Sequence, residues 1–263
     1  MIDSLLNIPN IQRKVFTRHF IKNVIIEFSF YALFQDVIIA KKEYLKESFK
    51  NLGFTICENI SQVQFALGIR DEKPTVNTTD EVVGFVFGNN DEKIRIELVE
   101  NKLIINVFKY QNFENFFCKI EKIIDVINNV LQDNKLITNI SLKKVNSIIS
   151  TETKSYEDIT NVLNSNFLAI MRNDTIPYEN FESCYDIFKV RRDEYNCSVS
   201  SKCKKRKEDE FEIVLDITIS QDLSNSEIKI SQVLENINNT NFSIFSWATT
   251  DYFKQIMNEE NEK

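Results

Sequence analysis

The chain has 263 residues, of which 43% are hydrophobic and 27% charged, a composition that supports a folded core and excludes a disordered chain. Its formal net charge of −7 disfavours non-specific binding to nucleic acid or to an anionic membrane surface. No segment has about 18 consecutive apolar residues, so the sequence predicts no membrane-spanning helix.

The spacing of apolar residues predicts strands and helices throughout the first half. Residues 20–34 alternate between apolar and polar side chains, as a half-buried strand does. Residues 36–52 have a helical apolar stripe, and Gly53 follows where a helix C-terminal glycine belongs. We expect four short antiparallel strands next, then a long amphipathic helix and an extended stretch: residues 63–70, 82–87, 94–99, 103–110, 112–132 and 137–149.

The second half repeats this succession of strands and helices. Ser155 and Asp158 have the spacing of a capping box at the start of a helix. Residues 185–191, 195–201 and 211–219 are expected to be strands, and residues 231–257 to be helical with a break at Asn238-Asn-Thr-Asn241. The sequence therefore predicts an α+β fold in two halves, each with antiparallel strands packed against long amphipathic helices.

A polar stretch over residues 150–156 is the best place to divide the chain. We expect an N-terminal α+β half over residues 1–150 and a C-terminal α+β half over residues 151–263. One continuous domain is the alternative, since no repeat of sequence identity is visible between the halves.

Glycine and histidine are too scarce for several familiar kinds of active site. The glycines are Gly53, Gly68, Gly84 and Gly88, and none of them forms a phosphate-binding loop or a dinucleotide fingerprint. His19 is the only histidine that could serve as the base of a nucleophilic triad, and no nucleophile motif accompanies it. We expect no cofactor.

The five cysteines are odd in number and widely spaced: Cys57, Cys118, Cys184, Cys197 and Cys203. This pattern is typical of reduced thiols and predicts a cytoplasmic protein. A zinc site needs paired ligands at short spacing, so we expect no metal site and interpret Cys197 and Cys203 as buried or incidental thiols. Carboxylate chemistry stays open, because Glu212 or the Glu92-Lys93 pair could belong to a metal-dependent hydrolase.

Four motifs in order along the chain resemble a sporadically distributed family of uncharacterised bacterial and archaeal proteins of similar length. They are the strand Lys22–Phe30, the helix start Tyr110-x-x-Phe113-Glu-x-Phe116, the segment Leu142-Lys-Lys-Val-Asn-Ser-Ile148, and the C-terminal Phe245-Ser-Trp-Ala-Thr-Thr-Asp251. The family has an Arg-Tyr step where this chain has Lys143-Lys144. The resemblance implies no activity, and the patchy distribution of the family resembles that of mobile antiviral defence cassettes.

The sharpest local feature is a basic segment between two predicted strands, which consists of Lys202, Lys204, Lys205, Arg206 and Lys207. Such a segment can bind phosphates or an acidic protein, or it can be a solvated hairpin tip that keeps strand edges apart. Arg191-Arg192 and Lys143-Lys144 extend the basic surface if the fold brings them together. Aromatic and basic residues also alternate over Arg13–Phe20, and the last helix, with Trp247, either packs in the core or presents an apolar face to a partner.

The sequence lacks the motifs of most familiar enzymes, and we therefore expect a non-enzymatic interaction or regulatory protein. The resemblance adds the expectation of a sensor or partner subunit in a bacterial defence system. A nucleic-acid-binding accessory that uses the basic hairpin and a carboxylate- or metal-dependent hydrolase are the alternatives. We expect a protein partner and no membrane association, while nucleic-acid binding and homo-oligomer formation stay open.

Overall fold

The computed structural model describes residues 8–9, 11–17, 20–31, 35–70, 73–99, 101–131, 137–151, 155–164, 167, 177–207, 210–223 and 229–258. Over residues 63–70 and 73–79, and at positions 131, 150, 151 and 178, it describes the backbone alone. Strands and helices are both spread along the described chain, which is therefore α+β.

The described elements occur in two successive series, each of which begins with a strand and ends with helix. The first series is β1 (Ile21–Phe30), α1 (Gln35–Ala40), α2 (Lys42–Asn51), β2 (Ile56–Arg70), β3 (Lys73–Asn89), β4 (Ile94–Val99), β5 (Lys102–Val107) and α3 (Phe113–Leu131). The second is β6 (Ile137–Thr151), α4 (Tyr156–Thr160), the 3-10 turn η4 (Tyr178–Asn180), β7 (Ser183–Arg192), β8 (Tyr195–Lys207), β9 (Glu210–Asp222), α5 (Ile230–Ala248) and α6 (Asp251–Asn258).

The described strands all belong to one antiparallel sheet of nine strands, in the order β2-β3-β4-β5-β1-β6-β9-β8-β7. The prediction of two halves, each with its own strands packed against long amphipathic helices, is therefore wrong. β1 and β6 are neighbours in the sheet, and the backbone N–H of Ser147 donates to the carbonyl oxygen of Phe20 at 2.9 Å. The alternation of apolar and polar residues along a strand indicates which side chains are buried, but it does not indicate which strand is the neighbour in the sheet.

The chain divides into two compact units. One consists of residues 1–26 and 139–263, and the other of residues 27–138. The chain passes from one unit to the other within β1 and again within β6. The division predicted from the sequence is a different one, and its boundary after residue 150 lies at the end of β6.

The unit of residues 27–138 has an aromatic core against the meander of β2 to β5. The rings of Phe49 on α2 and Phe87 on β3 have centroids 4.3 Å apart, and both side chains are fully buried. The helix predicted over residues 112–132 is confirmed as α3, and Gly53 ends α2 with a φ of +87°. That left-handed conformation favours glycine, and the Gly53 N–H donates to the Lys50 carbonyl oxygen at 2.9 Å.

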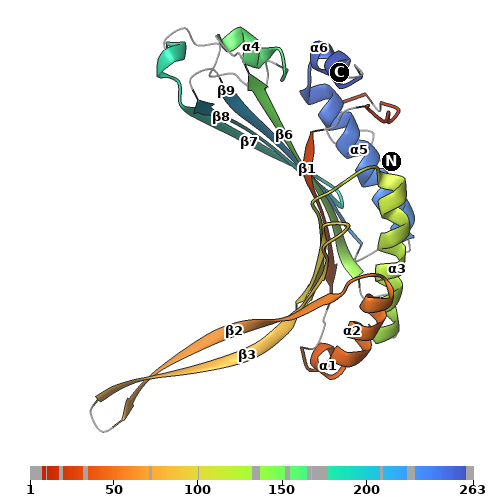
Figure 1. Cartoon of the computed structure of the whole chain (residues 1–263), viewed down its shortest axis with the longest axis vertical. Coiled ribbons are helices and arrows are strands. Elements are labelled where there is room, and N and C mark those ends of the chain that lie inside the picture. Colours follow the sequence, from red (N-terminus) through yellow and green to blue (C-terminus); the bar gives the residue numbers. More distant parts are fainter. Residues whose placement is uncertain are drawn as a thin grey trace. The chain divides into compact units, whose positions relative to one another are not determined.

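β2 and β3 form a long two-stranded ribbon within this unit. Their register runs from Ile56 opposite Gly88 to Arg70 opposite Lys73, whereas β3 pairs with β4 only from Gly84 to Asn89. The far part of the ribbon thus has no third strand among the described residues (Figure 1). Gly84 lies where the third strand begins, and a Cβ there would collide with the backbone of β4.

In the other unit, α5 lies along one face of the sheet formed by β6 to β9 (Figure 1). Alternate side chains of β9 are completely buried: Phe211, Ile213, Leu215, Ile217 and Ile219. The buried side of α5 includes Val233, Leu234 and Ile237. The three strands predicted over residues 185–219 are confirmed as β7, β8 and β9, because a strand with one covered face requires this alternation.

The predicted break of the last helix at Asn238–Asn241 is wrong, since α5 is continuous through these residues and ends at Ala248. Asn238 and Asn241 are 0% and 1% exposed. The Asn241 side-chain amide donates to the carbonyl oxygen of Ile217 at 2.9 Å. The two asparagines satisfy buried polar groups of the sheet and do not compete with the helix backbone.

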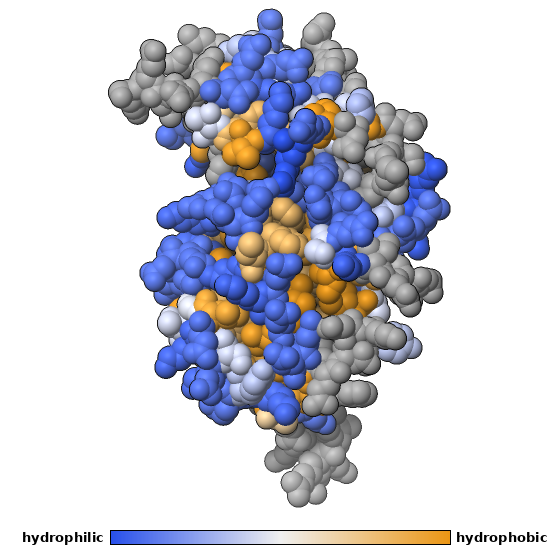
Figure 2. Space-filling view, turned by 90° about the vertical axis from the view of Figure 1, so that its right-hand side faces the viewer, coloured by the Kyte–Doolittle hydropathy of each residue, from blue (hydrophilic) through white to orange (hydrophobic). Residues whose placement is uncertain are grey.

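None of the helices in the described ranges is both long and apolar enough to cross a membrane. Hydrophobic side chains nevertheless reach the surface in several places. On the side shown in Figure 2 they lie between hydrophilic residues. Val15, Tyr31 and Tyr252 are among the large apolar or aromatic residues that are more than half exposed. Scattered exposure of this kind is normal for folded proteins.

Candidate interaction surface

β7, β8 and β9 position the predicted basic segment. Along β8 the odd-numbered residues from Cys197 to Cys203 are buried, on the face of the sheet that α5 covers. The even-numbered residues therefore belong to the opposite face, which we call the open face. On β7 the residues opposite Lys202 and Lys204 are Tyr185 and Ser183, and they share this face.

The predicted basic residues differ in their surroundings. Lys202 and Lys204 are exposed, and Lys204 lies opposite Glu212 of β9. Arg206 and Lys207 both pair with Glu210, at 3.6 and 3.8 Å. β8 continues to Lys207 and β9 begins at Glu210, so the segment forms the end of strand β8 in a hairpin, whereas the sequence predicts it between the two strands. Exposed ion pairs at these distances are weak, and they leave much of the positive charge accessible to a partner.

The sequence did not single out two exposed side chains of β7 that lie on the same face. Tyr185 is 60% exposed and Ile187 is 50% exposed. Tyr185 lies directly opposite Lys202, and Ile187 lies opposite Ser200. The alternation of β7 predicts that these residues share a face, but not that the face is open, since that depends on the covering elements. Together with Lys202 and Lys204 they form what we call the β7–β8 surface.

The β7–β8 surface is basic within an acidic chain. β7 and β8 contain eight basic residues and one acidic residue, Asp186, whereas the whole chain has a net charge of −7. No ion pair between described residues involves Lys189, Arg191, Lys202 or Lys204. A local positive field of this kind attracts an acidic partner and falls as the ionic strength rises.

Neither Arg191-Arg192 nor Lys143-Lys144 extends the basic segment directly. Arg191 lies opposite Asn196, about 20 Å along β8 from Lys202 at the usual rise of a strand. Lys143 pairs with Asp216 at 3.0 Å. Lys144 is only 7% exposed, on the covered face of the sheet. The fold therefore places Arg191 at the far end of the same hairpin and removes Lys143-Lys144 from the basic surface.

Lys144 is the most unusual titratable group of the described residues. Its Nζ donates to the Oδ1 of Asn238 on α5 at 2.6 Å. Burial, with a smaller effect from Arg13, lowers the pKa of Lys144 to about 7. The Asn238 Nδ2 is buried without a hydrogen-bond partner. A buried amine of this kind is costly for stability.

Burial disfavours the thiolate form of the hairpin cysteines. Cys197 and Cys203 are buried on the covered face, and burial raises the pKa of both thiols to about 12. Cys184 lies opposite Cys203, and burial also raises the pKa of its thiol. All three are free cysteines. Thiols in such surroundings are protonated at neutral pH and are poor nucleophiles and poor metal ligands.

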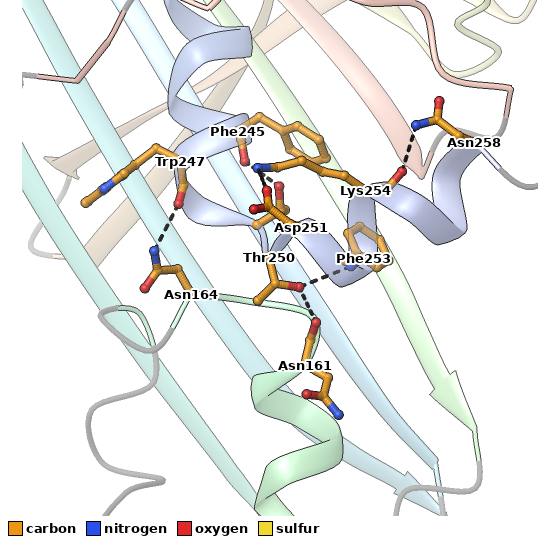
Figure 3. Close-up of polar contacts among 10 residues, drawn as sticks. Asn161, Asn164, Phe245, Trp247, Thr250, Asp251, Phe253, Lys254 and Asn258 are labelled. Atoms are coloured by element: carbon orange, nitrogen blue, oxygen red, sulfur yellow. Dashed lines mark hydrogen bonds and ion pairs between the residues drawn. The ribbon is translucent and has the colours of Figure 1, made fainter.

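The C-terminal motif of the resemblance forms the junction between α5 and α6 (Figure 3). The Thr250 hydroxyl donates to the Asn161 carbonyl oxygen and accepts from the Phe253 N–H at 3.1 Å. The Asn164 side chain donates to the Trp247 carbonyl oxygen at 3.3 Å. Thr250 is thus the N-cap of α6, and the Thr-Asp step performs a structural task. The Trp247 ring packs edge-on against Phe167, with centroids 5.0 Å apart, which favours the core interpretation of this helix.

Aromatic residues of the predicted Arg13–Phe20 stretch also pack against these helices. Phe16 stacks on Phe242 with ring centroids 6.0 Å apart, and Phe20 lies 5.2 Å from Phe253. They are therefore contacts of the fold and not a free stacking platform for bases. His19 lies outside the described residues.

The unit of residues 27–138 contains an open pocket of about 360 Å³ beside the start of α3. Tyr110, Phe116 and Val107 supply its apolar wall. Lys119 and Glu92, both in its lining, form an ion pair with each other. Asp91 and Lys109 also line the pocket, and no buried polar atom points into it without a partner among those that the structure describes.

The carboxylates considered for a hydrolase have structural contacts. Glu212 accepts a hydrogen bond from the Ser147 hydroxyl at 2.7 Å, and Glu92 pairs with Lys119. Across the described ranges, no three or more histidine, cysteine, aspartate or glutamate side chains lie close enough together to hold a metal ion. Comparison with known protein families and with curated proteins finds no match for the chain.

Proposed function

We propose that this chain is a non-enzymatic interaction protein that binds an acidic partner protein through the β7–β8 surface. In the bacterial defence setting that the family resemblance implies, it is an accessory or sensor subunit. The observation that supports the proposal is the exposure of Tyr185 and Ile187 beside the exposed lysines Lys202 and Lys204.

Each part of the surface has a role that protein interfaces require. Tyr185 and Ile187 supply apolar area that is released from water when a partner covers it, and tyrosine is one of the residues enriched at the centres of interfaces. Lys202 and Lys204 supply charge at the rim, which speeds encounter with an acidic surface and orients it. A sheet face is rigid, so little conformational entropy is lost on binding.

Differential co-purification at native expression levels is the first test. We expect a partner that is retained by the wild type and by Tyr252→Ser, and is lost with the double variant Tyr185→Ser/Ile187→Ser. Tyr252 is a matched control because it is 58% exposed and lies on α6, outside the surface. A partner retained equally by all three proteins contradicts the proposal, as does the absence of any partner.

The charge component is tested with purified probes. A glutamate-rich peptide is expected to bind the wild type more tightly at low salt, and Lys202→Ala/Lys204→Ala should weaken it about tenfold. Lys46→Ala/Lys50→Ala on α2 is the control for charge alone. No salt dependence, or an equal loss in the control, refutes the electrostatic contribution.

Nucleic-acid binding is the second candidate, and the juxtaposition of Tyr185 with Lys202 favours it, because an aromatic ring beside a cation suits an unstacked base and its phosphate. The test is a short single-stranded oligonucleotide in the same titration. Tighter binding of the oligonucleotide than of the acidic peptide, lost with both Tyr185→Ser and Lys202→Ala, would replace the protein-binding proposal. The net charge of −7 opposes this outcome, because a nucleic acid is repelled by the net negative charge of the whole chain.

A further inference from the structure

β7 is the last strand of the sheet among the described residues, so one of its backbone edges has no neighbouring strand there. The direction of its hydrogen bonds follows from one contact: the Lys205 N–H donates to the carbonyl oxygen of Glu182 at 2.9 Å. In an antiparallel pair the residues that exchange hydrogen bonds alternate along the strand. The even-numbered residues of β7 therefore bond to β8, and the odd-numbered ones from Ser183 to Arg191 direct their N–H and C=O groups outward.

An exposed edge of this kind is a template for another strand. Side chains along this strand are exposed: Tyr185 and Ile187 are 60% and 50% exposed, and Asp186 and Lys189 are exposed as well. Neither a proline nor a bulge interrupts β7 over its ten residues. The lysine and the two arginines of the strand lie towards its C-terminal end, which makes the two ends of the edge electrostatically different.

The sequence of β7 is complementary to itself when two copies run antiparallel about Ile187. In that register Ile187 meets Ile187 of the second copy, Tyr185 meets Lys189, and Ser183 meets Arg191. On the other face of the strand Glu182 meets Arg192, which places opposite charges beside each other. Apolar, cation–aromatic and opposite-charge pairs across antiparallel strands all stabilise a sheet.

The other registers that place odd-numbered residues opposite each other are less favourable. Centring the pair on Asp186 places two aspartates opposite each other at the axis, and centring it on Lys189 places two lysines there, which is destabilising. Centring it on Phe188 places Ile187 opposite Lys189 and Glu182 opposite Glu194. Centring it on Tyr185 leaves Lys189, Arg191 and Arg192 without partners on the second β7. Only the register about Ile187 places Glu182 opposite a basic residue.

We propose that two copies of this chain associate through β7, antiparallel about Ile187, so that their sheets join edge to edge. The odd-numbered residues form about five hydrogen-bonded pairs with the second strand. The arrangement has twofold symmetry, in which the same patch is used on both copies. The side chains of Tyr185 and Ile187 still emerge on the open face, so the dimer places two β7–β8 surfaces side by side.

The test measures the molar mass of the full chain by size-exclusion chromatography with light scattering, up to about 100 µM protein. The wild type is expected at twice the chain mass of 30.9 kDa. Ile187→Lys places two lysines at the axis and should yield a monomer. Ile149→Lys is the matched control, because Ile149 is 46% exposed on β6, away from the edge, and this variant should stay dimeric.

A charge swap tests the register itself. Glu182→Arg and Arg192→Glu should each shift the equilibrium towards monomer by about tenfold in Kd, and the double variant Glu182→Arg/Arg192→Glu should restore the dimer. Both side chains lie on the face of β7 opposite to Tyr185, so this test leaves the β7–β8 surface unchanged and is independent of the proposed function. A monomeric wild type, loss of the dimer in Ile149→Lys, or a double variant as weak as the single ones overturns the proposal.

Discussion

Replacing the buried Lys144 by methionine is expected to stabilise the protein at neutral pH. The pKa of Lys144 is about 7 in the fold and ordinarily 10.5, and its side chain is completely buried. Between pH 7 and 10.5 the unfolded chain therefore binds a proton that the folded chain does not, so the free energy of unfolding rises with pH, by up to about 1.4 kcal/mol per unit. At pH 7 the accumulated penalty is about 4 kcal/mol, and at pH 9.5 it is about 1 kcal/mol.

Methionine fills nearly the same space without a charge, but it leaves the Asn238 Oδ1 without the lysine donor, which costs about 1–3 kcal/mol. Net stabilisation at pH 7 is thus about 1–3 kcal/mol. A more sensitive measure is the free energy of unfolding of the variant minus that of the wild type. This difference should fall by about 3 kcal/mol from pH 7 to pH 9.5. Urea denaturation followed by circular dichroism at several pH values measures it.

Lys143→Met is the matched control, since Lys143 precedes Lys144 on β6 and pairs with Asp216 on the open face. The change in stability with pH should be clearly larger for Lys144→Met than for this control. A difference in the free energy of unfolding from the wild type that does not vary with pH, or that varies equally in the two variants, refutes the lowered pKa of Lys144.

Three further predictions concern single positions. Gly84→Val should destabilise the chain by about 3 kcal/mol or prevent folding, because its Cβ would collide with a carbonyl oxygen of β4; thermal denaturation measures the change, and a near-wild-type Tm contradicts the close approach. Thr250→Ala should cost about 1 kcal/mol through loss of the α6 N-cap, and Thr250→Ser should recover most of it. Cys118 is exposed and should react rapidly with a disulfide reagent at pH 8, whereas Cys197 and Cys203 should react only on unfolding. Fast labelling of either of these two thiols in the folded chain contradicts their burial.

Local patterns predicted most elements but failed where a residue bonds to a distant strand. The capping box at Ser155 is present, with the hydroxyl of Ser155 accepting from the Asp158 N–H at 3.4 Å, because both partners lie within one turn. The asparagines of α5 look like a helix break by composition, yet Asn238 contacts Lys144, which is 94 residues away. Propensity describes a residue without its tertiary partners, and a buried partner can reverse the expected conformation.

The sequence predicts the basic part of the β7–β8 surface but not its apolar part. The basic residues between Lys202 and Lys207 lie close together in the chain, so the sequence alone reveals the basic segment. The local pattern predicts a strand that contains Tyr185 and Ile187, but it does not indicate that these side chains are exposed beside Lys202. Their place in the surface depends on the antiparallel register of β7 with β8 and on the position of β7 at the end of the described sheet.

By itself the sequence determined the types of elements, the buried stripes of α3 and α5, and the absence of common catalytic motifs, because these follow from residue type and short-range period. Only the tertiary structure decided that one sheet joins all the described strands, that Lys144 is buried while Lys143 is partly exposed, and that β7 is the last strand of the described sheet. These properties depend on which strands are neighbours and on which face a helix covers. Neither is encoded within the few residues that a local pattern spans.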